Sequence, residues 1–112
     1  MSAEGLKAVE KYDIVHISNA LDHTQDIVKA FENLKRAVKP GGYLIVQGFE
    51  NEATFENWVG FHQWNVSISE NELYVEGKDK IGRLDSSGWS TIHAETSKLP
   101  SGKNWIIYII QK

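Results

Sequence analysis

The pattern of apolar and polar positions between residues 12 and 49 predicts a strand, a helix and a second strand in succession. Tyr12–Ser18 and Tyr43–Phe49 are short apolar runs bounded by turn residues. Such runs are typical of strands that are buried on both faces. Between them, apolar residues recur every three or four positions over Ile27–Val38, which is the spacing of one helical face. The stretch is therefore interpreted as a βαβ unit with two parallel strands.

Both ends of the predicted helix carry suitable capping residues. Asp26 precedes the first apolar position, where its carboxylate can accept the free N–H groups of the first turn. Lys35 and Arg36 lie near the other end, where cations complement the helix dipole. Pro40 is expected to stop the helix, and Gly41–Gly42 to turn the chain into the second strand.

The rest of the chain is rich in strand patterns. Asn65–Ser69 and Glu72–Glu76 alternate around Glu70–Asn71, which predicts a hairpin with a two-residue turn. A short strand is expected next, and then two longer strands that form a second hairpin. These three strands are predicted at Ile81–Leu84, Trp89–Ser97 and Asn104–Gln111.

Length and composition favour one soluble globular domain over residues 1–112. The chain has 112 residues, of which 41% are hydrophobic and 24% charged. Its formal net charge of −3 argues against a nucleic-acid partner, because binding phosphates requires a basic surface. The N-terminal residues have no apolar core of signal-peptide length, and no apolar run is long enough to span a bilayer. We therefore expect a cytoplasmic protein without a membrane partner.

No metal site is expected from the sequence. The chain has no cysteine, which excludes a disulfide framework and a thiolate metal site. His93 and Glu95 match the H-x-E motif of zinc deaminases, but the C-x-x-C motif that must accompany it is missing.

Two motifs in the βαβ unit resemble those of a known enzyme family. The first strand ends in an N-x-L-D-H motif at 19–23, and the helix is followed by K-P-G-G at 39–42. Their order and spacing resemble the second half of a class I S-adenosylmethionine-dependent methyltransferase, which carries N-x-L-E-H after its fourth strand and K-P-G-G before its fifth. Asp22 stands where the family usually has Glu. The resemblance covers residues 12–49 well and the remainder loosely.

The resemblance implies an α/β fold, namely part of a Rossmann-like methyltransferase sheet in which β-hairpins follow the βαβ unit. The mixed sheet should have the order first strand, second strand, last strand, penultimate strand, in a three-layer-like arrangement. The helix over Ile27–Val38 should cover one face. The hairpin at Asn65–Glu76 would be an insertion that lengthens a sheet edge or covers the methyl-acceptor site.

The family's cofactor-binding motif is absent from the sequence. Methyltransferases of this class hold S-adenosylmethionine largely through an E/D-x-G-x-G-x-G turn after their first strand, and only eleven residues precede Tyr12. The chain is thus expected to lack the cofactor-binding half, to be inactive alone, and to use S-adenosylmethionine only if that half is supplied. Two alternatives stay open: a non-catalytic methyltransferase-like assembly or binding module, and a fragment of a longer enzyme.

The resemblance also nominates site residues at the carboxyl end of the first strand. Ser18, Asn19, Ala20 and Leu21 would lie beside the cofactor. Asn19 offers an amide for hydrogen bonding, and His23 a general base for a hydroxyl, amine or thiol acceptor. Alternatively, Asn19 and His23 only satisfy backbone groups of the loop.

A second candidate region follows the second strand. A short helix is predicted at Glu52–Val59, and then comes an aromatic and polar cluster at 60–64. Its members His62 and Gln63 are candidates for binding the acceptor substrate. Alternatively, Phe61 and Trp64 are core residues and His62 is an ordinary loop residue.

The first strand should also have a free edge, because the family's first strand would be its outer neighbour. An unpaired apolar edge is a template for another chain. We therefore predict either a homodimer, in which two copies of Tyr12–Ser18 pair antiparallel, or a complementary methyltransferase half at this edge. The remaining alternative is a monomer whose edge is covered by its own leader or tail.

Overall fold

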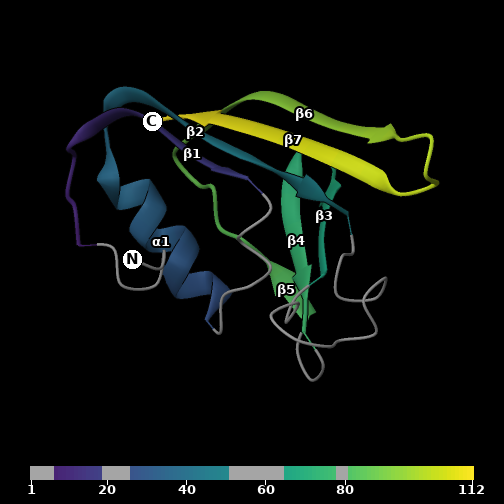
Figure 1. Cartoon of the computed structure of the whole chain (residues 1–112). Coiled ribbons are helices and arrows are strands. Elements are labelled where there is room, and N and C mark those ends of the chain that lie inside the picture. The colour runs from purple at the N-terminus through teal and green to yellow at the C-terminus, as the bar shows by residue number, and fades with distance from the viewer. Residues whose placement is uncertain (1–6, 19–25, 51–64, 78–80) are drawn as a thin grey trace.

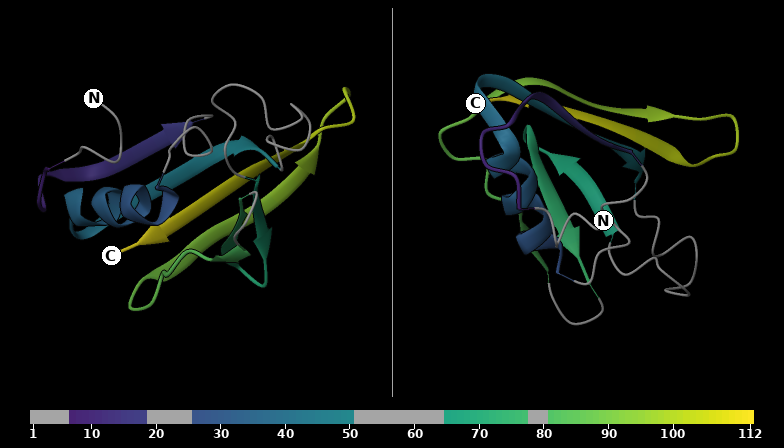
Figure 2. Two further views of the ribbon diagram at one scale, coloured as in Figure 1. Left: turned by 90° about the horizontal axis from the view of Figure 1, so that it is seen from below. Right: turned by 60° about the vertical axis from the view of Figure 1, so that its left-hand side comes forward.

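The computed structural model describes residues 7–18, 26–50, 65–77 and 81–112. A four-stranded sheet lies on one side of the molecule, and helix α1 and a three-stranded sheet both lie on the other (Figures 1 and 2). In chain order, the elements are β1 (Tyr12–Ser18), α1 (Ile27–Ala37), β2 (Val38–Phe49), β3 (Asn65–Ser69), β4 (Glu72–Glu76), β5 (Ile81–Arg83), β6 (Ser90–Lys98) and β7 (Asn104–Gln111).

The four-stranded sheet has the strand order β1-β2-β7-β6, which confirms the predicted order. β1 and β2 are parallel, whereas β7 runs antiparallel to both β2 and β6. The sheet is therefore mixed, with the βαβ unit on one side of it and the C-terminal hairpin on the other.

Helix α1 confirms the predicted helical face and its N-terminal cap. The Asp26 carboxylate accepts a hydrogen bond of 3.0 Å from the backbone N–H of Lys29. Phe31 and Leu34 are buried, and they join residues of both sheets in one hydrophobic core. The helix ends at Ala37, one residue earlier than predicted, because Val38 is already extended.

The K-P-G-G segment at 39–42 differs from the predicted helix stop and turn, because it lies within β2. Tyr12 pairs with Val38 and Ile14 with Tyr43, so Asp13 alone faces four residues of β2. The extra residues bulge out, and Gly41 has a positive φ of 83°. Prolines in sheets occur at such irregular positions, where no ladder hydrogen bond is lost.

The end of β7 anchors this bulge. The Gly41 N–H donates to the Lys112 carbonyl, and the Lys112 N–H donates to the Gly42 carbonyl, at 3.0 and 2.9 Å. The Lys112 ammonium also donates to the Val38 carbonyl at 2.8 Å, close to the C-terminus of α1. The motif thus joins α1, β2 and β7.

The first hairpin is confirmed, with Glu70 and Asn71 at positive φ as a tight two-residue turn requires. However, the hairpin does not lengthen the edge of the four-stranded sheet. It combines with β5 into a separate sheet, because its apolar residues Val66, Leu73 and Val75 pack into the core beside α1.

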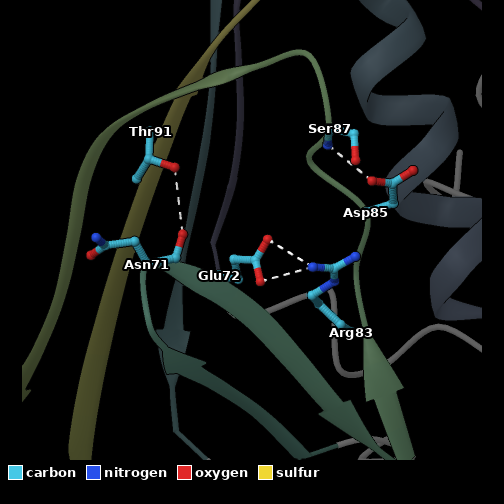
Figure 3. Close-up of polar contacts among 6 residues, drawn as sticks. All are labelled: Asn71, Glu72, Arg83, Asp85, Ser87 and Thr91. Atoms are coloured by element: carbon cyan, nitrogen blue, oxygen red, sulfur yellow. Dashed lines mark hydrogen bonds and ion pairs between the residues drawn. The ribbon is translucent and has the colours of Figure 1, made fainter.

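Polar contacts fix this small sheet in place (Figure 3). The Arg83 guanidinium on β5 donates to both carboxylate oxygens of Glu72 on β4, at 3.1 and 3.0 Å. This contact raises the pKa of Arg83. The Thr91 hydroxyl on β6 donates to the Asn71 carbonyl at 3.4 Å, which links the two sheets.

The prediction that β1 and β2 are buried on both faces is wrong for the part of the chain that the structure describes. Leu44 and Val46 on β2 are buried, but the alternating residues Tyr43 and Ile45 stay exposed or partly exposed. The reason is that α1 and the small sheet cover the same side of the four-stranded sheet (Figure 1). The described elements therefore form two layers, not three. We call the uncovered side of the four-stranded sheet the outer face.

Within the described ranges, no helix has the length and apolar composition required to cross a membrane.

Candidate functional site

The carboxyl ends of β1 and β2 meet at one edge of the four-stranded sheet, as parallel strands must (Figure 2). Ser18, the last residue of β1, is exposed and pairs with Gln47, two residues before the end of β2. Open α/β sheets bind ligands at this kind of edge. We call this edge, where β1 ends at Ser18 and β2 ends at Phe49, the carboxyl edge.

Of the predicted site residues, the structure describes Ser18 alone and places it at this edge. Asn19, Ala20, Leu21 and His23 follow it directly in the chain but lie outside the described residues. The same holds for the acceptor-site candidates and the helix before them, which are His62, Gln63 and Glu52–Val59. Their roles stay predictions.

A hydrogen-bonded pair close to Ser18 was missed by the sequence analysis. The side-chain nitrogen of Gln47 lies 3.0 Å from Nε2 of His16, across the β1–β2 ladder. In this amide orientation Gln47 donates to a neutral imidazole whose proton is on Nδ1. The sequence does contain one signal for this pair, because Gln47 is the lone polar side chain within the apolar run Tyr43–Phe49. The pair therefore places polar side chains on the outer face, next to the carboxyl edge.

An aromatic cluster lies where β2 ends and β7 begins. The rings of Phe49 and Trp105 meet edge to face, with centroids 5.1 Å apart and an interplanar angle of 87°. The Lys103 ammonium lies 4.9 Å from the centre of the Phe49 ring, within cation–π range. The Asn104 amide donates to the Glu50 carboxylate at 3.0 Å. These contacts hold the end of β2 against the start of β7.

A second polar group lies across the outer face, on β6. The Glu95 carboxylate contacts Nε2 of His93 at 2.9 Å and accepts a hydrogen bond from the Ser97 hydroxyl. The hydroxyl, and secondly the imidazole, lower the pKa of Glu95 by stabilising its charged form. Through the strand pairings, Glu95 lies in the same cross-strand row as Ile107, Gln47 and Ser18.

Comparison with known proteins gives relatives for the chain and for its fold. A segment of the hybrid PKS-NRPS synthetase lepA from Aspergillus flavus is 28% identical over 95 residues, which are 80% of this chain and 2% of the synthetase. The N-methyltransferase NodS from Bradyrhizobium japonicum WM9 matches the whole chain with a TM-score of 0.65 and 13% identity. A further structure of NodS is a complex with S-adenosyl-L-homocysteine. The [4+2]-cyclase SpnF also matches the whole chain, with a TM-score of 0.62 and 11% identity.

These relatives are longer than this chain, which spans 57% of NodS and 54% of SpnF. The structural likeness confirms the expected Rossmann-like methyltransferase fold. A family model described as a methyltransferase domain matches residues 2–79, which is more than half of the chain. The chain therefore belongs to the methyltransferase domain family.

Proposed function

We propose that this chain supplies the acceptor side of an S-adenosylmethionine-dependent methyltransferase. The observation that carries the proposal is the carboxyl edge, where the exposed end of β1 at Ser18 leads into the N-x-L-D-H motif. The family match over residues 2–79 and the S-adenosyl-L-homocysteine complex of NodS support it.

The described residues of the edge suit one flank of such a cofactor. Ser18 offers an exposed hydroxyl, and Gln47 offers an amide that already orients His16. Both are neutral groups that can form hydrogen bonds with a nucleoside. S-adenosylmethionine supplies an activated methyl group when bound. Asn19 would hold the cofactor or the acceptor, and His23 would take the proton that the acceptor loses.

We further propose that cofactor binding needs a complementary half that carries the glycine-rich turn. The sequence of this chain has no E/D-x-G-x-G-x-G motif, whose glycines let the backbone approach the ligand closely. By itself the chain would contact one flank of the cofactor only. Binding to the isolated chain should therefore be weak.

The experiment is an NMR titration of the isotope-labelled chain with S-adenosylhomocysteine at millimolar concentration. Shifts should be confined to the residues around 18–23 and 47–50, and an unrelated nucleotide such as ATP should not produce them. Shifts elsewhere, or no shifts at all, would remove the support for a cofactor site at this edge.

A second candidate function is a non-catalytic or non-methylating module. The [4+2]-cyclase SpnF supports this alternative, because it shares the fold of this chain. A shared fold does not determine the reaction. Once the chain is combined with its complementary half, an assay of methyl transfer separates the two functions, and His23→Ala and Asn19→Ala test the predicted site residues. Methyl transfer by the combined halves contradicts the module, and its loss in either variant supports the role of that residue. Unchanged turnover in both variants removes these residues from the site.

A further inference from the structure

We propose that β6 pairs antiparallel with β6 of a second copy of this chain, about a two-fold axis at Ala94. β6 forms the edge of the four-stranded sheet that lies away from β1 (Figure 2). The two sheets would join into one continuous sheet. This pairing concerns the assembly of the chain, needs no cofactor, and goes beyond the proposed function.

The outer edge of β6 is free among the described strands. β6 pairs with β7 only, and Ala94 and Ser97 are its only residues that are even partly buried. The Leu99 N–H donates to the Lys103 carbonyl at 2.8 Å. Because the direction of backbone groups alternates along an antiparallel ladder, the preceding odd-numbered residues of the regular ladder also bond to β7. Ala94 and Thr96 therefore direct their N–H and C=O groups outwards, where another strand can pair with them.

A basic and an acidic side chain flank Ala94 on the outer face. The side chains of His93 and Glu95 are each 47% exposed and lie in contact at 2.9 Å. In an antiparallel pairing centred on Ala94, His93 lies directly opposite Glu95 of the second copy, and the two-fold axis repeats this contact. Both are non-hydrogen-bonded pairs, in which side chains come closest together. Since an imidazole N–H can donate to a carboxylate, the strand carries both halves of the contact.

The same two residues disfavour the neighbouring registers. If the axis lay at His93 or at Glu95, that residue would face its own symmetry mate, and like charges directly opposite destabilise a sheet. The bulge between Thr91 and His93 ends the regular part of the strand. The new ladder is therefore short, and the dimer should be weak and in exchange with the monomer.

A second contact is expected on the side of the sheet that carries β3–β5. The Thr91 hydroxyl donates to the Asn71 carbonyl, so the turn that includes Glu70 lies against the start of β6 (Figure 3). Lys98, at the other end of β6, is exposed and points to this side, because side chains alternate along a strand and Ala94 packs into the core. In the pairing, Lys98 of the second copy lies beside Thr91. Its ammonium would therefore come near the exposed carboxylate of Glu70.

A second copy suits this edge because the edge is complementary to itself. A two-fold contact uses the same patch on both subunits, and this patch holds the acid and the base of each expected contact. The pairing also leaves no open β6 edge in the dimer, so it closes without further growth at this strand.

The first test combines two charge variants of exposed side chains. His93→Glu brings two acids opposite each other, and Glu95→Lys brings two bases opposite each other. Each variant alone should dimerise about tenfold more weakly than the wild type, or less. In an equimolar mixture the acidic copy faces the basic copy, and the dimer should return. Sedimentation velocity over a concentration series measures this, and Val28→Lys on α1, where Val28 is 54% exposed, is the control that should dimerise like the wild type.

The second test examines the register by cross-linking and does not depend on charge. The chain has no cysteine of its own. In the proposed pairing, residue 93 of one copy and residue 95 of the other have Cα atoms about 4.5 Å apart, which suits a disulfide. A mixture of His93→Cys and Glu95→Cys copies should therefore oxidise to a mixed dimer about tenfold faster than either variant alone.

A wild-type chain that stays monomeric throughout the concentration series overturns the proposal. A dimer that both charge variants leave intact also overturns it, because another surface, such as the edge of β1, then joins the copies. A mixture of the charge variants that stays monomeric contradicts the pairing of His93 with Glu95. Cysteine variants that cross-link no faster when mixed contradict the axis at Ala94.

Discussion

At the scale of single residues, Gly42 shows how closely β2 approaches β1 at the K-P-G-G bulge. A Cβ atom at this position would lie 2.5 Å from the Asp13 carbonyl oxygen and 2.8 Å from a Val38 methyl group. Both neighbours belong to the packed sheet and cannot move freely. The K-P-G-G motif therefore has a structural role here, whichever reaction the domain serves.

Gly42→Ala should lower the free energy of unfolding by about 1–3 kcal/mol, as overpacking does. The control is Gly82→Ala in β5, where a Cβ atom would have no neighbour within 4 Å. Urea denaturation of both variants measures the difference. Equal stability of the two variants would show that β1 does not approach Gly42 as described.

The cluster on β6 predicts a pH-dependent property of a single carboxyl group. Because the Ser97 hydroxyl is the main cause of the lowered pKa of Glu95, Ser97→Ala should raise that pKa. The contacts of Glu95 favour the folded state at pH values above its unfolded pKa, and they are lost as the pH falls through the lower folded pKa. NMR titration of the Glu95 carboxyl carbon measures the shift.

The control for this prediction is Thr96→Ala, because Thr96 points to the opposite face of the same strand. It should leave the titration of Glu95 unchanged. An unchanged pKa of Glu95 in the Ser97 variant would contradict the hydrogen bond between the two side chains.

At the scale of elements, α1 carries much of the core. Phe31 is 1% exposed and Leu34 is 5% exposed, and both join the core cluster. Phe31→Ala and Leu34→Ala should each destabilise the protein by about 2–5 kcal/mol, because each leaves a cavity. Val28→Ala on the exposed side of the helix should change stability far less. Chemical denaturation of the three variants tests this, and similar losses in all three would mean that the buried face is assigned wrongly.

The elements that could be predicted from the sequence are those set by local chemistry. Asp26 and the apolar spacing specify α1, and Glu70–Asn71 specifies the turn between β3 and β4. Among the described residues, β1 and β2 are not buried on both faces as predicted, because an apolar run does not show how many layers cover it. The His16–Gln47 pair was missed because its residues are 31 positions apart and meet only through the strand register. The predicted roles of Asn19, His23, His62 and Gln63 stay predictions.

At the scale of the whole molecule, the carboxyl edge and the outer face belong to one four-stranded sheet. The covered face provides the core, and the carboxyl edge provides the candidate site. Under the proposed function, the carboxyl edge would contribute one flank of a cofactor site and a complementary half would contribute the other. Cofactor affinity is therefore expected to depend on completing the sheet.

Calorimetric titration with S-adenosylmethionine, of the isolated chain and of the chain combined with its complementary half, tests this account most directly. We predict no saturable binding by the isolated chain at micromolar concentrations, because the glycine-rich turn is missing from its sequence. The chain combined with its complementary half should bind. Binding by the isolated chain in the low micromolar range or better would contradict the account.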